Sequence, residues 1–119
     1  HIHNKIYPII PNFSFDLLQI KYLFLSRNQI EIIEDSAFQN IAGIRYLELN
    51  LNRIKNLTIN YLISMDEVSL VQNEIEIVDE WLFFNLTKLI FINLSKNRIS
   101  FLSSKAFETN KLLSRLFLN

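Results

Sequence analysis

The residues in this sequence best suited to chemistry are His1 and His3, which flank a single residue. On one face of an extended segment, a His-x-His pair can bind a metal weakly, although an exposed chain end explains the same pair more simply. Serines are scattered without a GxSxG motif, and a single glycine cannot form a P-loop or a GxGxxG loop. Carboxylates such as Glu74 and Glu76 are expected to face solvent. The sequence therefore predicts no enzyme, no catalytic or metal site and no cofactor.

Four asparagines lie in Asn-X-Ser/Thr sequons, which accept N-linked glycans in secreted proteins. They are Asn12, Asn56, Asn85 and Asn93. Three of these sequons read NLT or NLS, which a repeat rich in asparagine and leucine also produces by itself. The sequons therefore favour a glycoprotein without requiring one.

Composition narrows the possible partners. The chain has 119 residues, so it forms one domain at most, and half of them are apolar, enough for a core. Lys+Arg and Asp+Glu both number 12, and this neutral balance argues against nucleic acid or an anionic membrane as the main partner. No apolar run approaches the roughly 18 residues of a membrane span, so no membrane insertion by this segment is expected. Cysteine is absent, which excludes disulfides and thiolate metal sites.

One nine-residue sequence motif recurs along the chain. It is YLFLSRNQI from Tyr22, YLELNLNRI from Tyr46, EVSLVQNEI from Glu67 and FINLSKNRI from Phe91. Its asparagines are Asn28, Asn52, Asn73 and Asn97, with steps of 24, 21 and 24 residues. Apolar residues follow each asparagine at nearly constant offsets, and the same offsets also fit, with one miss, after Asn4.

The pattern LxxLxLxxNxI followed by phenylalanine resembles the typical leucine-rich repeat of about 24 residues. The resemblance covers almost the whole chain and implies an α/β repeat solenoid. Such a solenoid has a curved parallel sheet on its concave side and irregular loops with short helical turns on its convex side. Residues 1–119 are then one domain of about five repeats, open at both ends. A missing cysteine-rich cap at either end suggests a piece of a longer array.

Elementary physics favours the same fold. Alternating apolar residues, as in Leu47 and Leu49, predict short strands with one buried face. An antiparallel meander needs hairpins with positive φ, usually at glycine, and Gly43 is the only glycine. A coil that returns in the same direction avoids hairpins, stacks its strands in parallel and covers each apolar edge with the next coil.

Two sets of residues are predicted to hold the coils together. The resemblance implies a ladder in which each repeat asparagine satisfies backbone groups of its own coil and the next. Phenylalanines would form a second spine near the convex side, at Phe38, Phe83 and Phe107, with Leu62 in that position in the short repeat. Asp35 and Ser36 are suited to capping a helical turn. The short segment 55–65 is expected to change the curvature locally.

Residues between the buried leucines should face outward on the concave sheet. Ten of them form the predicted partner-binding site: Tyr22, Phe24, Tyr46, Glu48, Glu67, Ser69, Phe91, Asn93, Arg115 and Phe117. A third outward row consists of Ser26, Asn50, Val71, Ser95 and Asn119. Aromatic residues with an arginine are typical of protein-binding hot spots, although aromatic residues also suit any strand surface.

Three functions remain open on the sequence alone: an extracellular recognition module, an intracellular scaffold, and a structural arm that forms a homo- or heterodimer. The sequons and phrases such as EDSAF and SSKAF are similar to extracellular members, including Toll-like receptor ectodomains and insect leucine-rich immune proteins. This resemblance implies a secreted or ectodomain location, with the cytoplasm less favoured, and an innate-immune role. Glycans would fit convex or flanking turns at Asn12, Asn56 and Asn85, whereas a sugar at Asn93 would interfere with a ligand.

Overall fold

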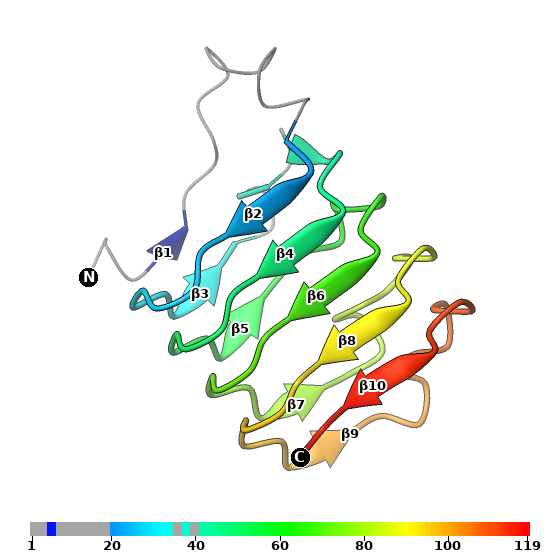
Figure 1. Ribbon diagram of the computed structural model, residues 1–119. Helices are drawn as coiled ribbons and strands as arrows, with labels where there is room; N and C mark the ends of the chain where they lie inside the picture. The colour runs from blue at the N-terminus through cyan, green and yellow to red at the C-terminus, as the bar shows by residue number, and fades with distance from the viewer. Residues whose placement is uncertain (1–4, 7–19, 35–36, 39–40) are drawn as a thin grey trace.

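The computed structural model describes residues 5–6, 20–34, 37–38 and 41–119, and these residues form ten short strands along a stack of coils (Figure 1). Each coil runs along one side, crosses to the other side and returns, so that neighbouring strands run in the same direction. The expectations for His1, His3, Asn12, Asp35 and Ser36 lie outside the described residues.

Five strands, one from each coil, form the sheet of the concave side. They are β2 (Tyr22–Phe24), β4 (Tyr46–Glu48), β6 (Glu67–Ser69), β8 (Phe91–Asn93) and β10 (Arg115–Phe117). Their order is β10-β8-β6-β4-β2, and every neighbouring pair is parallel. In β4, Leu47 is fully buried between two half-buried neighbours, as the alternation predicts. The predicted parallel solenoid is confirmed.

The convex side carries two sheets with fewer strands than the concave sheet, and neither was predicted from the sequence. One contains β1 (Lys5–Ile6), β3 (Ile32–Ile33) and β5 (Asn56–Leu57), and the other contains β7 (Ile77–Val78) and β9 (Phe101–Leu102). Single turns connect the two sides, closed by bonds such as Leu89 N–H to the Leu86 carbonyl at 3.3 Å. These are the short helical turns that were expected, and none of the described residues continues into a longer helix.

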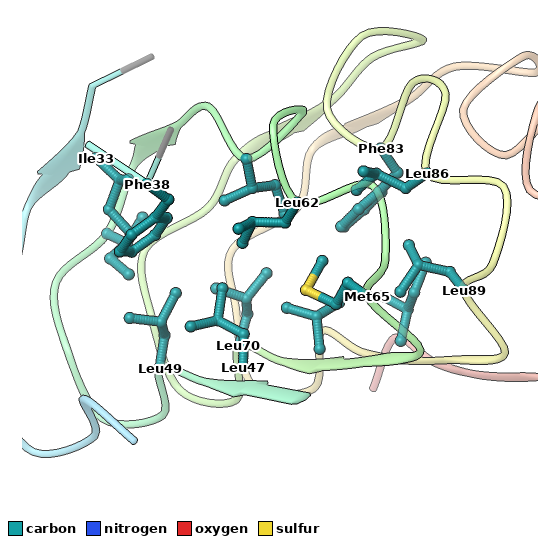
Figure 2. Packing of buried hydrophobic residues seen from close by; sticks show 14 of the residues in the cluster. Ile33, Phe38, Leu47, Leu49, Leu62, Met65, Leu70, Phe83, Leu86 and Leu89 are labelled. Carbon is teal, nitrogen blue, oxygen red and sulfur yellow. The ribbon is translucent and has the colours of Figure 1, made fainter. Parts of the chain in front are cut away.

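The core lies between the two sides, where inward residues of the concave strands meet those of the convex loops (Figure 2). Full burial of such side chains contributes about 1.5–3 kcal/mol each. Phe38 and Phe83 are fully buried, and the ring of Phe83 stacks on that of Phe107 with centroids 5.9 Å apart. The predicted phenylalanine spine is therefore present.

In the short repeat, the residue in the phenylalanine position differs from the prediction. In the described coils with a phenylalanine here, its carbonyl accepts the amide three residues later, as Phe38 accepts from Ile41 at 3.0 Å. The equivalent bond in the short repeat runs from the Leu62 amide to the Ile59 carbonyl, also at 3.0 Å. Ile59 therefore holds the phenylalanine position. The assignment of Leu62 to it is wrong, and Leu62 is buried at the position of Ile41.

The three missing residues come from the loop after the convex strand. The pairing of β3 with β5 places Ile33 opposite Leu57. Residues 34–37 separate Ile33 from Phe38, whereas Thr58 alone separates Leu57 from Ile59. The short repeat thus lacks the convex loop that its neighbours have.

This deletion interrupts the convex ladder between β5 and β7, which do not pair. Glu74 N–H donates to the Ile54 carbonyl at 2.9 Å. Among the described residues, no further backbone bond crosses between these two coils until they reach the concave side. The side-chain amide of Asn60 bridges the gap instead, donating to the carbonyls of Trp81 at 3.2 Å and Phe84 at 2.9 Å.

The recurrent asparagines join neighbouring coils through their side-chain amides. Oδ1 of Asn52 accepts the amides of Asn28 and Ile30, each at 3.1 Å. Its Nδ2 donates to the carbonyls of Leu49 in its own coil at 3.0 Å and Leu25 in the preceding coil at 3.1 Å. The predicted ladder is present, but Asn52, Asn73 and Asn97 reach back to the preceding coil and not forward to the next.

Burial along the ladder is uneven. Asn73 is buried and Asn97 is partly buried, and both bond in the manner of Asn52. Asn28 is exposed and donates to the carbonyls of Leu25 and Ser26 within its own coil. The expectation of a sheltered amide therefore holds for the later three asparagines and not for Asn28.

The residue before each of these asparagines lies in the left-handed region, with φ of 61° at Arg27, 59° at Leu51, 59° at Gln72 and 60° at Lys96. This conformation costs a non-glycine residue about 1–2 kcal/mol. Its amide reaches the following coil, as in the bond from Leu51 N–H to the Val71 carbonyl at 2.9 Å. The scarcity of glycine therefore does not exclude positive φ in this chain.

A second kind of buried asparagine appears at Asn110, in a position that is apolar in the other repeats. Its Nδ2 donates to the carbonyls of Phe83 at 2.9 Å and Leu86 at 3.0 Å. Each of these carbonyls also accepts a backbone amide in its own turn. Oδ1 of Asn110 is buried without a partner among the described residues. The side chain links two coils but leaves one polar atom unsatisfied.

Candidate functional site: the concave sheet

The strand register brings the predicted outward residues into two continuous rows. The first row is Tyr22, Tyr46, Glu67, Phe91 and Arg115, and the second is Phe24, Glu48, Ser69, Asn93 and Phe117. Neighbours within a row lie on adjacent strands, about 4.8 Å apart. All ten predicted residues therefore belong to one side of one sheet.

A first aromatic cluster, Tyr22, Phe24 and Tyr46, lies on β2 and β4. The ring of Tyr46 is 6.5 Å from that of Tyr22 and 5.6 Å from that of Phe24, centroid to centroid. Tyr22 is 66% exposed and Phe24 is 61% exposed. Exposed aromatic rings grouped in this way form a surface on which a partner can bury large area.

A second aromatic cluster, Phe91, Arg115 and Phe117, lies on β8 and β10. The two phenylalanine rings are 5.7 Å apart, and the Arg115 guanidinium lies 5.0 Å from the centroid of Phe91 and 5.7 Å from that of Phe117. A guanidinium over aromatic rings contributes about 0.5–1 kcal/mol when exposed, which favours this position of the Arg115 side chain. This end of the face is apolar and cationic.

Polar residues separate the two clusters. The Glu48 carboxylate accepts the Ser26 hydroxyl at 2.7 Å and the Tyr46 hydroxyl at 3.3 Å, one at each oxygen. Glu67 lies beside Tyr46 on the next strand. The central part of the face is therefore acidic, and the carboxylate of Glu48 is fixed in place.

Ser69 differs from the other residues of its row because it is only 6% exposed. Its hydroxyl donates to Oδ1 of Asn50 at 2.7 Å, and the same oxygen accepts the amide of Val71 at 2.9 Å. Ser69 can therefore act on a partner through Asn50, which belongs to the third outward row and lies next to the acidic centre.

The environment of Tyr46 changes its ionisation. Burial raises the pKa of Tyr46 above its ordinary value of 10.0, and the charges of Glu48 and Glu67, with the hydrogen bond to Glu48, raise it further. The tyrosine therefore stays protonated at neutral pH and donates its hydroxyl to Glu48.

The three sequon asparagines in the described residues lie in different surroundings. Asn56 is exposed on β5, and Asn85 is exposed on a convex turn with φ of 64°. Asn93 lies half-buried in the concave sheet, where its Oδ1 accepts the amide of Ser95 at 3.0 Å. The expected division between convex and concave sequons is present for these three.

A second surface feature, which sequence reasoning missed, lies on the convex side. The absent loop of the short repeat leaves a notch of about 760 Å³. Residues 55–58 form its floor, β3 forms one wall, and β7 with residues 79–82 forms the other. The 21-residue step was the signal, but locating the notch required the corrected position of Ile59.

The described residues contain no cluster of three or more histidine, cysteine, aspartate or glutamate side chains arranged for a metal ion. Nor do they include a helix with the length and hydropathy to span a bilayer.

Comparison with known proteins places the repeats in a family. Residues 3–54 and 63–119 match the family model described as leucine rich repeat. The chain belongs to the leucine-rich repeat family. The internal gap in the match of this leucine-rich repeat chain, residues 55–62, contains the shortened convex loop. Leucine-rich repeat domains generally mediate protein–protein interaction.

Individual relatives match only parts of this leucine-rich repeat chain. Lumican of Gallus gallus is 38% identical over 52 residues, which are 44% of this chain and 13% of lumican. Lumican of Bos taurus is 46% identical over 37 residues, which are 31% of this chain and 11% of that protein. The chain thus spans a small part of the length of these relatives.

Among solved structures, an internalin of Listeria monocytogenes (inlF) aligns over 94% of this chain and 39% of its own. The TM-score is 0.49 at 17% identity.

Proposed function

We propose that this leucine-rich repeat domain is an extracellular recognition module that binds a protein partner through its concave sheet. The observation that carries the proposal is the face itself, on which two aromatic clusters flank an acidic centre. Tyr22, Phe24, Tyr46 and Phe91 would be the anchors. Glu48, Glu67 and Arg115 would select a partner of complementary charge.

The geometry supports binding by a preformed surface. Inward neighbours of the anchor residues, such as Leu47 and Ile92, are fully buried, so the strands are held in place from below. The carboxylate of Glu48 is held by two hydroxyl groups. A face that is already ordered loses little conformational entropy when a partner binds, which favours affinity.

An extracellular location is supported by the exposed sequons at Asn56 and Asn85 and by the resemblance to extracellular members of the family. Innate-immune recognition is the form of this role that the same resemblance supports. Expression in a secreting eukaryotic cell, followed by mass spectrometry of tryptic peptides, tests the location. Retention in the cytosol without glycans would favour an intracellular scaffold instead.

The binding role is tested with a panel of purified extracellular ectodomains, measured against immobilised wild-type and variant chains. Phe91→Ala and Tyr46→Ala should each lower the affinity for a true partner about 30-fold, because a central anchor contributes about 2 kcal/mol or more to binding. The matched control is Phe101→Ala, an aromatic that is 53% exposed on convex strand β9. Equal effects of Phe101→Ala and Phe91→Ala would contradict a concave site.

A second copy of the chain is the other protein that could occupy this face. Sedimentation velocity of the purified domain separates the two cases. A dimer that Phe91→Ala dissociates and Phe101→Ala leaves intact would mean that the face serves self-association, as in a dimerising arm. A monomer across the concentration range supports recognition of a different protein.

A further inference from the structure

The notch on the convex side contains a glycan acceptor on its floor. Asn56, Leu57 and Thr58 form a sequon, and all three residues line the notch. Asn85 and Asn93, the other sequon asparagines that the structure describes, do not line it. A sugar attached to Asn56 would therefore begin inside the notch.

The wall opposite β3 offers an apolar platform. Trp81 is 59% exposed and Ile77 is 58% exposed, and both line the notch. The Trp81 ring packs against Phe84 at 5.2 Å between centroids, edge to face, which fixes its position. Exposed indole provides a large, flat surface with low entropy cost, suited to the CH-bearing face of a pyranose ring.

Polar groups surround this platform. The Asn60 side chain lines the notch, and so do Lys55 and Glu76, which form an ion pair of 3.7 Å with both side chains about half exposed. Lys55 and Glu76 are accessible and can hydrogen-bond to sugar hydroxyl and N-acetyl groups, whereas the Asn60 amide nitrogen already donates to the carbonyls of Trp81 and Phe84. The carboxyl residues Glu34 and Asp79 also line the notch, so polar groups are at least as prominent in it as the apolar platform.

The notch also explains why a sugar would stay there. It lies where the short repeat has Thr58 alone in place of the four residues 79–82 of the following coil, so its volume is set by the fold. A ligand attached to the floor binds intramolecularly, and weak contacts are sufficient because the effective concentration is high.

We propose that Asn56 carries an N-linked glycan whose first sugar residues lie in the notch against Trp81 and Ile77, in place of the missing loop. This rests on the proposed extracellular location. The Asn56 amide nitrogen loses a proton and bonds to the anomeric carbon of a lipid-linked oligosaccharide. The bond from that carbon to the pyrophosphate oxygen breaks, and protonated lipid pyrophosphate leaves.

Trp81 is the only tryptophan of the chain, so its fluorescence reports on the notch alone. The experiment uses the full chain secreted from a eukaryotic host, with glycan occupancy at each sequon measured by mass spectrometry. Trp81 emission and acrylamide quenching are measured before and after enzymatic removal of N-glycans. We expect glycan at Asn56, emission at shorter wavelength in the glycosylated protein, and stronger quenching after removal.

Matched variants assign the effect to Asn56. Thr58→Ala removes the sequon without changing the asparagine and should lose the protection of Trp81, whereas Thr58→Ser keeps the sequon and should retain it. Asn93→Gln, on the concave side, should leave the quenching unchanged. Loss of protection in Asn85→Gln but not in Thr58→Ala would assign the shielding to the neighbouring sequon and overturn the proposal.

An unmodified Asn56 in the secreted protein, or equal quenching of the glycosylated and deglycosylated forms, would also overturn it. Neither result bears on the concave face, because Phe91→Ala and Tyr46→Ala test that face with or without glycan. A protein that is never secreted contradicts both the proposed location and the glycan, whereas secretion with a bare Asn56 contradicts the glycan alone.

Discussion

Replacing Asn52 by leucine removes the most extensively bonded amide of the ladder, and the structure sets the cost. The amides of Asn28 and Ile30 lose their acceptor, Oδ1 of Asn52. A buried amide left without a partner costs about 1–3 kcal/mol, and because the amide of Asn28 is only partly buried, the pair costs at most about 2–6 kcal/mol. Burial of the apolar leucine side chain offsets about 1.5–3 kcal/mol of this cost.

The carbonyls that Asn52 serves do not add to this cost, because each retains another donor. The Leu25 carbonyl still accepts Nδ2 of Asn28 at 2.9 Å, and the Leu49 carbonyl still accepts Nδ2 of Asn73 at 3.0 Å. The midpoints of the two ranges leave a net loss of about 2 kcal/mol, a substantial share of the roughly 5–15 kcal/mol by which domains are stable.

Urea unfolding, followed by circular dichroism and by Trp81 fluorescence, measures this loss. With a slope of about 1–3 kcal/mol per molar urea, the midpoint should fall by about 1–2 M. The control is Asn28→Leu, because the Asn28 side chain is exposed and water can replace its bonds to Leu25 and Ser26. If Asn28→Leu costs as much as Asn52→Leu, or if Asn52→Leu is neutral, buried amide pairing does not hold these coils together.

Three further predictions follow from single contacts. Glu48→Gln should lower the pKa of Tyr46 toward 10.0 in an ultraviolet titration, because one charge that raises it is removed. Since that pKa is raised in the folded state, its contribution to stability is present below pH 10 and is lost as the pH rises through the folded value. An unchanged Tyr46 titration would contradict the contact. Gln72→Gly should raise the free energy of unfolding by about 0.5–1 kcal/mol by relieving the left-handed φ, whereas Gln72→Val should lower it. The urea midpoints of the two variants test this, and a higher midpoint for Gln72→Val than for Gln72→Gly would refute backbone strain at this residue. Asn110→Leu should stabilise the chain by about 1–2 kcal/mol, because it replaces a buried oxygen without a partner by apolar volume, and a lower urea midpoint would show that the two donated bonds matter more.

Most of the fold could be predicted because the repeat restates the same physical constraints in every coil. The alternation around Leu47 and Leu49 fixes which side chains point inward. Register then follows, because a slip by one residue would expose the leucines. The concave rows were predictable for the same reason, with Ser69 as the exception, since its burial depends on the neighbouring Asn50.

Features that depend on one coil, and not on the repeat, could not be predicted. Aligning the short repeat from its start places Leu62 near the phenylalanine position, whereas the turn bonds place Ile59 there. Both residues are apolar and buried, so composition cannot distinguish them. The break between β5 and β7, and the notch with Trp81, follow from that single choice of where three residues are lost.

The spacing of the two aromatic clusters limits what the concave face can bind. From β2 to β10 there are four strand intervals of about 4.8 Å, so the clusters cover about 19 Å from end to end. The facing strands β4 and β8 are two intervals, or about 10 Å, apart. Full cover of both clusters takes a ligand that extends about 19 Å, as a protein surface of standard size does. For a partner that spans the face, Tyr46→Ala and Phe91→Ala should therefore weaken binding additively, since these residues do not touch each other. A double variant that binds no more weakly than the more damaging single variant would mean that the partner uses one cluster and that the acidic centre marks the edge of its site.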